Sequence, residues 1–194
     1  MKGIVALPDF ALRPSGDIGG RFVSSGLRGY QSAARHVQGL PYGRNSDRAC
    51  YRLVLAERRG TCSTKHALLA ALALEHGEYV DILLGIYEMD EENTPGIDEV
   101  LRQYGLTSVP EAHCYLAYRG NRVDLTREDE STGAVVNFPR EECIAPDQIG
   151  AYNVEKHRSF VPEWAAACGL EFEYVWQARE ECIETLAKPD ENLM

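Results

Sequence analysis

The stretch Gly60-Thr-Cys-Ser-Thr-Lys-His-Ala-Leu-Leu-Ala-Ala-Leu-Ala73 decides the fold. Thr61 is a residue type that caps the start of helices, and Gly77 is one that ends them, so the sequence predicts a helix between these two residues. Residues 67–74 are apolar on nearly every side, which is typical of a helix buried in the core. We therefore predict a buried central helix that Cys62 opens.

The rest of the chain predicts further helices before this segment and a sheet after it. Glycines and prolines predict mostly loop in the opening forty residues, and β-branched and aromatic runs after Gly77 predict strands, with a Gly120-Asn121 hairpin turn. This order indicates an α+β fold with a central buried helix on an antiparallel sheet and closing C-terminal helices. The expected helices are 30–38, 49–58, a short one ending near Gly105, 153–168 and 174–186, and the expected strands are 79–87, 112–118, 122–125 and 134–138.

Length and charge limit the classes of function that the chain supports. With 194 residues, of which 44% are hydrophobic and 26% charged, the chain is long enough to bury one core. We expect a single domain over residues 1–194, with its core at about 40–140 and a helical segment at 150–188. Thirty acidic and twenty basic residues give a net charge of −10, which argues against nucleic acid or an anionic membrane as the main partner.

The N-terminal sequence and the cysteines indicate a compartment. The apolar run before Pro8 is shorter than the core of a secretory signal, and no segment approaches the ~20 apolar residues that cross a bilayer. The six cysteines are scattered, without a C-x-x-C pair. These features predict a cytoplasmic protein with free thiols, no membrane contact and no cofactor.

Cys62 has the position that a catalytic thiolate needs. At the first turn of a helix, unpaired backbone N–H groups and the positive end of the helix dipole favour a thiolate over a thiol. The same N–H groups, including that of Cys62, can donate to the oxyanion that forms when a thiolate attacks a carbonyl carbon. The structural alternative is a small buried residue without chemistry.

His113 is the candidate base for this thiol. It begins a predicted strand, where its imidazole shares one face with Tyr115 and Ala117. A neutral histidine there can deprotonate Cys62 if an acceptor orients its second ring nitrogen. Asp124, on the return strand, is the best candidate for that acceptor.

A resemblance to a known family rests on three segments: Gly60–Ala73, Ala112-His-Cys-Tyr-Leu-Ala-Tyr118 and Val123-Asp-Leu-Thr126. Together they resemble the transglutaminase-like cysteine hydrolases, which have a papain-like fold, over about residues 40–126. In that family a G-x-C segment starts the central helix, one strand carries the histidine and the next carries the aspartate. Cys62, His113 and Asp124 occupy those places, so the resemblance implies a catalytic triad.

Two features depart from the family pattern. Leu125 replaces the usual proline, and the separation of His113 from Asp124 is shorter than usual. A two-residue Gly120-Asn121 turn pairs Ala117 with Asp124, which leaves the carboxylate about 13 Å along the strand from the level of the histidine. A bulge or a different turn must close this gap. Otherwise the partner of the histidine is one of two later acids, Glu128 or Asp129.

Further side chains are candidates for the same site. His66 lies four residues after Cys62, so both can project from one helical face, as a metal-ligand pair or as a second basic group beside the thiolate. Cys62, His66, His113 and Asp124 could form a zinc site, but a structural zinc site usually draws on closely spaced ligand pairs, of which only one is present, and we predict no metal. The segment 40–47 resembles an uncharacterised bacterial branch of the superfamily, and its Tyr42, Arg44 and Asn45 are weak candidates for an oxyanion or substrate contact.

The sequence thus predicts cysteine-dependent acyl chemistry on a peptide or small-molecule amide or on a thioester. His113 activates Cys62, a thioacyl-enzyme forms, and water or an amine resolves it, so that hydrolysis, transfer and cyclisation all stay open. The first alternative is a non-catalytic domain of the same fold that binds a peptide or small amide. The second is a metal-binding protein that uses Cys62 and His66.

Overall fold

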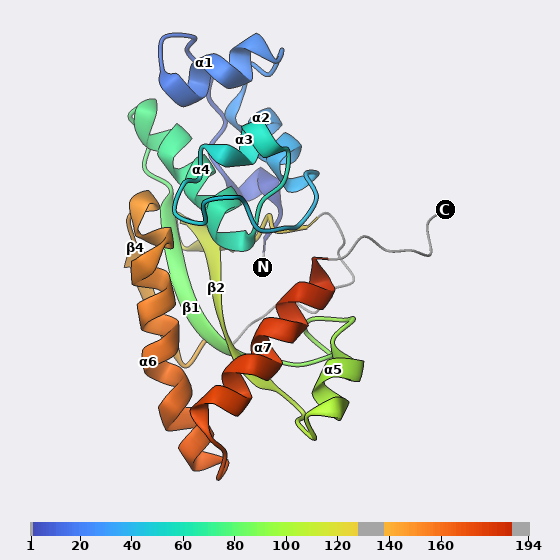
Figure 1. The fold of residues 1–194 in the computed structure, drawn as a ribbon. Coiled ribbons are helices and arrows are strands. Elements are labelled where there is room, and N and C mark those ends of the chain that lie inside the picture. Colours follow the sequence, from blue (N-terminus) through green and yellow to red (C-terminus); the bar gives the residue numbers. More distant parts are fainter. Residues whose placement is uncertain (1, 128–137, 188–194) are drawn as a thin grey trace, which may run out of the picture.

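The structure, a computed structural model, describes residues 2–127 and 138–187. Its helices are α1 (Asp17–Ser24), α2 (Tyr30–Gln38), α3 (Leu53–Glu57), α4 (Cys62–Glu75), α5 (Asp98–Gln103), α6 (Ala151–Ala167) and α7 (Phe172–Leu186), with single 3-10 turns at Ile4–Ala6 and Pro146–Ile149. Its strands are β1 (Asp81–Met89), β2 (Val109–Tyr118), β3 (Asn121–Val123) and β4 (Arg140–Ile144). The helices α1 to α3 gather around α4 at one end of the sheet, and α5 to α7 lie toward the other end (Figure 1). The predicted α+β class is confirmed.

α4 is the buried central helix that the sequence predicts. It begins at Cys62 because two threonines close a capping box: the Thr64 amide donates to Thr61 Oγ1 at 3.5 Å, and the Thr61 amide donates to Thr64 Oγ1 at 3.0 Å. Every residue from Thr64 to Ala73 is buried. Burial of each leucine here contributes about 1.5–3 kcal/mol to stability. The buried residues of α4 belong to the largest of the three hydrophobic clusters among the described residues.

The sheet has the strand order β3-β2-β1-β4, and all neighbouring strands are antiparallel. β1 and β2 pair along their whole length, with His113 opposite Gly85. Apolar side chains of both strands, Leu84 and Leu116 among them, belong to the same buried cluster as α4. The strand that carries His113 therefore has partners on both edges and packs against the central helix.

The turn between β2 and β3 differs from the predicted one. Tyr118 pairs with Asn121, so the two turn residues are Arg119 and Gly120 rather than Gly120 and Asn121. Their φ angles are 48° and 77°, and positive φ at both positions is the type I′ pattern, whose twist matches that of the flanking strands. Asn121 instead becomes the first residue of β3.

This turn corrects the predicted register by two residues. Ala117 pairs with Arg122, and the same register brings Asp124, just after the end of β3, level with Tyr115. Asp124 is thus two positions from the level of His113 instead of four. Since β3 ends at Val123, the aspartate has left the ladder and turns toward the histidine.

Besides the two 3-10 turns, one helix (α1) and one strand (β4) of the described structure were not predicted. α1 contains Gly19 and Gly20, which are poor helix formers, so the local sequence does not predict a helix. Packing nevertheless requires a glycine at position 19, because a Cβ there would lie 2.7 Å from the Arg13 carbonyl oxygen. The Glu75 carboxylate accepts hydrogen bonds from the first turn of this helix, including the Gly19 amide at 2.7 Å. Tertiary contacts with the end of α4 thus override the local preference.

The second unpredicted element is β4, whose sequence Arg-Glu-Glu-Cys-Ile lacks the apolar alternation of a core strand. It is an edge strand, paired only with β1 among the described strands. Residues 134–137 of the predicted strand 134–138 lie outside the described residues. The last residue of that prediction, Phe138, is described and lies in no strand. The predicted helix 49–58 is shorter, spanning only α3.

The C-terminal helices follow the prediction and begin two residues earlier than expected. α6 runs beside β4, and α7 crosses the lower part of the sheet (Figure 1). His157 of α6 fixes this packing, because its Nε2 lies 2.8 Å from the Pro110 carbonyl of β2. Trp164 and Trp176 are partly buried against a small cluster between the two helices. No helix in the described ranges is long and apolar enough to cross a membrane.

Candidate functional site

Cys62 is a half-buried free thiol at the first position of α4. Hydrogen bonds of 3.2 Å from the Gly43 amide to the Gly60 carbonyl and from the Gly60 amide to the Pro41 carbonyl hold the chain that leads into it. The first N–H groups of a helix have no intrahelical acceptor. The thiol therefore lies among donors that suit an anion.

The structure brings His113 and Asp124 together as predicted. His113 Nε2 lies 2.7 Å from Asp124 Oδ2. The other carboxylate oxygen accepts from the Thr126 amide at 2.9 Å and from the Thr126 hydroxyl at 2.6 Å. The carboxylate is thus fixed on both oxygens. The later acids Glu128 and Asp129, considered as substitutes, lie outside the described residues.

Electrostatics at this pair favour a charged imidazolium. Burial by itself lowers the pKa of His113, but the negative charges of Asp124 and Cys62 and hydrogen bonds to both side chains raise that pKa well above its ordinary value. Burial opposes ionisation of Asp124, yet the charge and hydrogen bond of His113 hold the pKa of the carboxyl well below its usual range.

His66 is buried, and both its ring nitrogens have partners. Nδ1 lies 2.7 Å from the Cys62 carbonyl, and Nε2 accepts from the Leu125 amide at 2.8 Å, which fixes the proton on Nδ1. Burial lowers the pKa of His66 to about 4, so the ring is neutral. His66 therefore is not the second base or metal ligand considered from the sequence. It ties the start of α4 to the backbone next to Asp124.

Tyr42 is the upstream residue that lies near the thiol. It forms a β-bridge with Gly60, two residues before Cys62, and the Arg127 guanidinium lies 4.9 Å from its ring centre. Burial and the charges of Cys62 and Glu111 raise the pKa of Tyr42, so its hydroxyl keeps its proton and can act as a donor.

Arg44 and Asn45, the other two upstream candidates, are engaged elsewhere. Arg44 Nη2 pairs with Glu180 Oε2 of α7 at 2.8 Å. Asn45 is buried, where it donates to the Arg59 carbonyl at 2.9 Å and accepts from the Thr64 hydroxyl at 3.0 Å. Both therefore hold the upstream loop in place, one against α7 and the other against the start of α4.

A buried ion pair beside the site was not predicted from the sequence. Glu111, two residues before His113 on the same face of β2, binds Arg179 of α7 through both carboxylate oxygens, with Arg179 Nη2 to Glu111 Oε1 at 2.7 Å. Strand alternation places Glu111 beside His113, but no local pattern points to a partner 68 residues later. Arg179 also contacts Glu180, which extends the network to the upstream loop.

Lys65 is fully buried next to the site. Its ammonium donates to the carbonyls of Gln38 at 3.1 Å, Leu40 at 2.6 Å and Thr126 at 2.7 Å. A buried ammonium needs such acceptors, because leaving it unsatisfied costs several kcal/mol. Lys65 thus joins the end of α2, the upstream loop and the segment after Asp124 to the central helix.

The arrangement combines a thiol at the start of a helix, an imidazolium within electrostatic reach of it and an oriented carboxylate. It suits nucleophilic attack on an electrophilic carbon, with His113 as the proton carrier. Within residues 2–127 and 138–187, no group of three or more His, Cys, Asp or Glu side chains is placed to hold a metal ion. Comparison of the chain with models of protein families, with curated proteins and with solved structures finds no match.

Proposed function

We propose that this protein performs cysteine-dependent acyl chemistry at the carbonyl of an amide or thioester, with Cys62 as nucleophile, His113 as acid and base, and Asp124 as the group that orients His113. The observation that carries the proposal is that His113 lies 2.7 Å from Asp124 and close enough to Cys62 for the charge of the thiolate to raise the pKa of the imidazole. A peptide or a small-molecule amide is the substrate class that we propose.

The proposed reaction begins with the proton of Cys62 on His113. The thiolate sulfur forms a bond to the substrate carbonyl carbon, and the carbonyl π electrons move to oxygen. The backbone N–H of Cys62 and the hydroxyl of Tyr42 are the proposed donors to that oxyanion. When the oxyanion collapses, the bond to the leaving amine or thiolate breaks, and His113 supplies its proton, which leaves a thioacyl-enzyme.

The second half of the proposed reaction regenerates the thiolate. Neutral His113 removes a proton from an incoming water or amine, whose lone pair attacks the thioester carbon. The carbon–sulfur bond then breaks, and Cys62 leaves as a thiolate beside the protonated imidazole. Whether water, an external amine or an amine of the same substrate arrives decides between hydrolysis, transfer and cyclisation.

We also propose that the fold is papain-like in the transglutaminase sense. Support comes from a buried helix that starts at the cysteine and from a hairpin whose first strand carries His113 and whose exit carries Asp124. The alternative of a non-catalytic binding domain drew its support from the doubtful hairpin register. The observed turn removes that support. The metal-binding alternative needs His66, whose nitrogens are both engaged.

Alkylation by iodoacetamide as a function of pH tests the proposed pair. Labelled peptides are quantified by mass spectrometry, with exposed Cys168 as an internal reference and Cys62→Ser as the blank. We expect Cys62 to be labelled rapidly at about pH 6, where an ordinary thiol with a pKa of ~8.5 is almost fully protonated. In His113→Gln this low-pH labelling should fall at least about tenfold, while labelling of Cys168 stays unchanged.

A second measurement tests acyl transfer itself. The protein is incubated with a small acyl thioester, and the mass of the Cys62 peptide is followed with time. A transient acyl adduct on Cys62 that His113→Gln abolishes is the expected result. If Cys62 is labelled no faster than Cys168, and if His113→Gln changes neither rate nor adduct, the catalytic proposal is wrong.

A further inference from the structure

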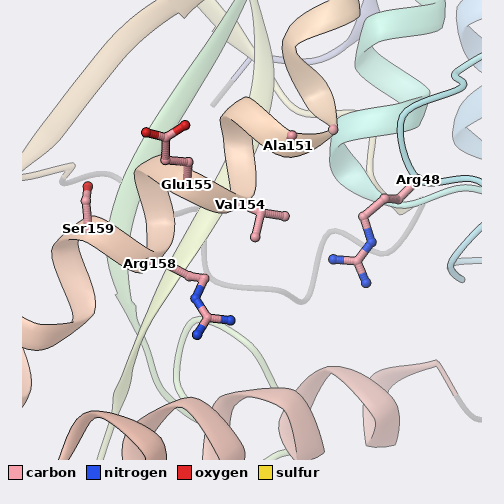
Figure 2. Close-up of a pocket in the computed structure, with 7 residues that line it drawn as sticks. Arg48, Ala151, Val154, Glu155, Arg158 and Ser159 are labelled. Carbon is pink, nitrogen blue, oxygen red and sulfur yellow. The ribbon is translucent and has the colours of Figure 1, made fainter.

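A pocket of about 650 Å³ lies between the first half of α6 and the loop before α3 (Figure 2). Its lining residues are Arg48, Gly150, Ala151, Val154, Glu155, Arg158 and Ser159. The Arg48 side chain extends from the loop toward α6 and the Arg158 side chain extends from α6 toward α7, whereas Glu155 and Ser159 point away from both (Figure 2). The pocket is a shallow depression that is widely open to solvent.

Arg158 is positioned by aromatic rings of α7. Its guanidinium lies 4.9 Å from the ring centre of Trp176 and 5.1 Å from that of Phe172. Stacking of this kind fixes the plane of a guanidinium and leaves its N–H donors available. Among the described residues, no carboxylate forms an ion pair with Arg158 or with Arg48.

Arg48 reaches the pocket from a tight turn that packs on the start of α6. The Asp47 side chain accepts the Ala49 amide at 2.8 Å, and the Cys50 amide donates to the Asp47 carbonyl at 3.2 Å. A Cβ on Gly150 would lie 2.6 Å from the Ala49 Cβ, so this position needs glycine for the close approach. The approach holds Arg48 across the pocket from α6.

The pocket attracts negative charge. Two unpaired guanidiniums face it, and α6 begins at its rim with Ala151 and no side-chain cap on its first amides. Free amides and the dipole at a helix start favour anions, and guanidinium forks match the oxygens of carboxylate and phosphate. Such a concentration of positive potential contrasts with the net charge of −10 over the whole chain.

The helix that lines the pocket also contacts β2, the strand that carries His113. Asn153, the neighbour of Val154 on α6, donates to Cys114 Sγ at 3.7 Å, and Cys114 follows His113 on β2. Burial raises the pKa of the Cys114 thiol, and the charge of Cys62 raises it further, which places Cys62 within electrostatic reach of Cys114. α6 therefore lines the pocket with some side chains and packs with another on the strand of His113.

We infer that this pocket binds an anionic oxyacid group, a carboxylate or a phosphate, of the substrate that Cys62 attacks. The inference rests on the proposed function for the link to Cys62, but not for the binding of the anion. Arg48 and Arg158 supply the donors from opposite walls. Ala151 and Val154 provide an apolar surface for the carbon chain that joins the anionic group to the carbonyl.

The test begins with direct binding. Inorganic phosphate and succinate are titrated calorimetrically, at low ionic strength, into the wild type, Arg48→Gln, Arg158→Gln and Cys62→Ser. Arg28→Gln is the matched control, because it also removes one exposed arginine charge but lies between α1 and α2, away from the pocket. We expect Arg48→Gln and Arg158→Gln each to weaken binding about tenfold, with Arg28→Gln and Cys62→Ser unchanged. Whether phosphate or succinate binds more tightly identifies the preferred oxyacid.

Protection of the thiol then tests the link to the site. The anion that binds should slow iodoacetamide labelling of Cys62 in the wild type and in Arg28→Gln, but not in Arg48→Gln. Arg48 lies in an exposed loop, so this comparison stands even if Arg158→Gln disturbs the packing of α7.

The outcomes separate this inference from the proposed function. Absence of binding, or equal affinity in all variants, overturns the anion site whatever the reactivity of Cys62. Arginine-dependent binding without protection of a reactive Cys62 overturns the assignment to its substrate. Arginine-dependent binding to a protein whose Cys62 is inert refutes the acyl chemistry and the substrate link together, and leaves only an anion site.

Discussion

At the scale of single residues, His66 connects the nucleophile and the aspartate through the backbone. Its two hydrogen bonds, to the Cys62 carbonyl and from the Leu125 amide, join the start of α4 to the chain beside Asp124. Proton uptake by His66 breaks the bond from Leu125, because Nε2 then becomes a donor facing a donor. The site is therefore sensitive to acid at a group that takes no part in the proposed chemistry.

This arrangement predicts a pH dependence of stability. The pKa of His66 is lowered from 6.5 to about 4 in the folded protein, so the unfolded chain binds the proton first as the pH falls. The stability that His66 contributes is thus complete above pH 6.5 and is lost toward pH 4, by up to about 3 kcal/mol. Urea unfolding at several pH values should show this loss in the wild type and a smaller one in His66→Gln, which cannot titrate. If the free energy of unfolding fell equally with pH in the two proteins, the prediction would be wrong.

Asp124 determines how strongly His113 holds its proton. In Asp124→Asn the hydrogen-bond geometry can persist, but the charge that raises the pKa of His113 is gone. We expect iodoacetamide labelling of Cys62 at pH 7 to slow about tenfold or more, since one pKa unit corresponds to a tenfold change. Asp98→Asn, which removes an exposed carboxylate on α5, is the control and should label as the wild type does. Equal rates in all three proteins would mean that Asp124 only holds Thr126.

At the scale of elements, the β2–β3 turn decides whether the site can form. Arg119 occupies the left-handed region at a φ of 48°, which costs about 1 kcal/mol for a residue that is neither glycine nor asparagine. Arg119→Asn, which creates the Asn-Gly pair that type I′ turns prefer, should therefore stabilise the protein by about 0.5–1 kcal/mol. Urea unfolding measures the gain. Gly120→Ala should destabilise the protein, because alanine is strained at a φ of 77°. If Gly120→Ala stabilised the protein instead, the assigned turn would be wrong.

The same elements show which features were accessible from the sequence. Thr61, Cys62 and Gly77 define the central helix by local chemistry, so its start was predicted correctly. The hairpin was predicted with the wrong turn, because Gly120 fits either of two adjacent positions and the choice shifts the register by two residues. The partnership of Glu111 with Arg179 depends on how α7 packs across the sheet, and no pattern in either segment predicts it.

At the scale of the whole molecule, one buried ion pair connects α7 to β2, the strand that carries His113. Arg179 and Glu111 have side chains only 12% and 8% exposed. Removing one partner leaves an uncompensated buried charge, so we expect Arg179→Leu to cost about 3–5 kcal/mol. Glu111→Leu combined with Arg179→Leu should recover most of that loss. Breaking the exposed pair on α5 with Arg102→Leu is the control, expected to change stability far less than Arg179→Leu does.

Thermal and urea unfolding of these variants provide the measurement. Recovery in the double variant would establish that the penalty comes from an isolated charge rather than from lost packing of α7. A double variant as unstable as Arg179→Leu alone would contradict this account.

The Lys65 ammonium has a consequence for how the protein opens. It binds carbonyls 25, 27 and 61 residues away, on both sides of the central helix in sequence. If any of these segments separated from α4, the buried Lys65 ammonium would lose one of its carbonyl acceptors. Hydrogen exchange at the amides around the thiol should then require the same opening event as exchange in the middle of the sheet. On this view the site has no partly open form, and heat inactivation and global unfolding are a single event.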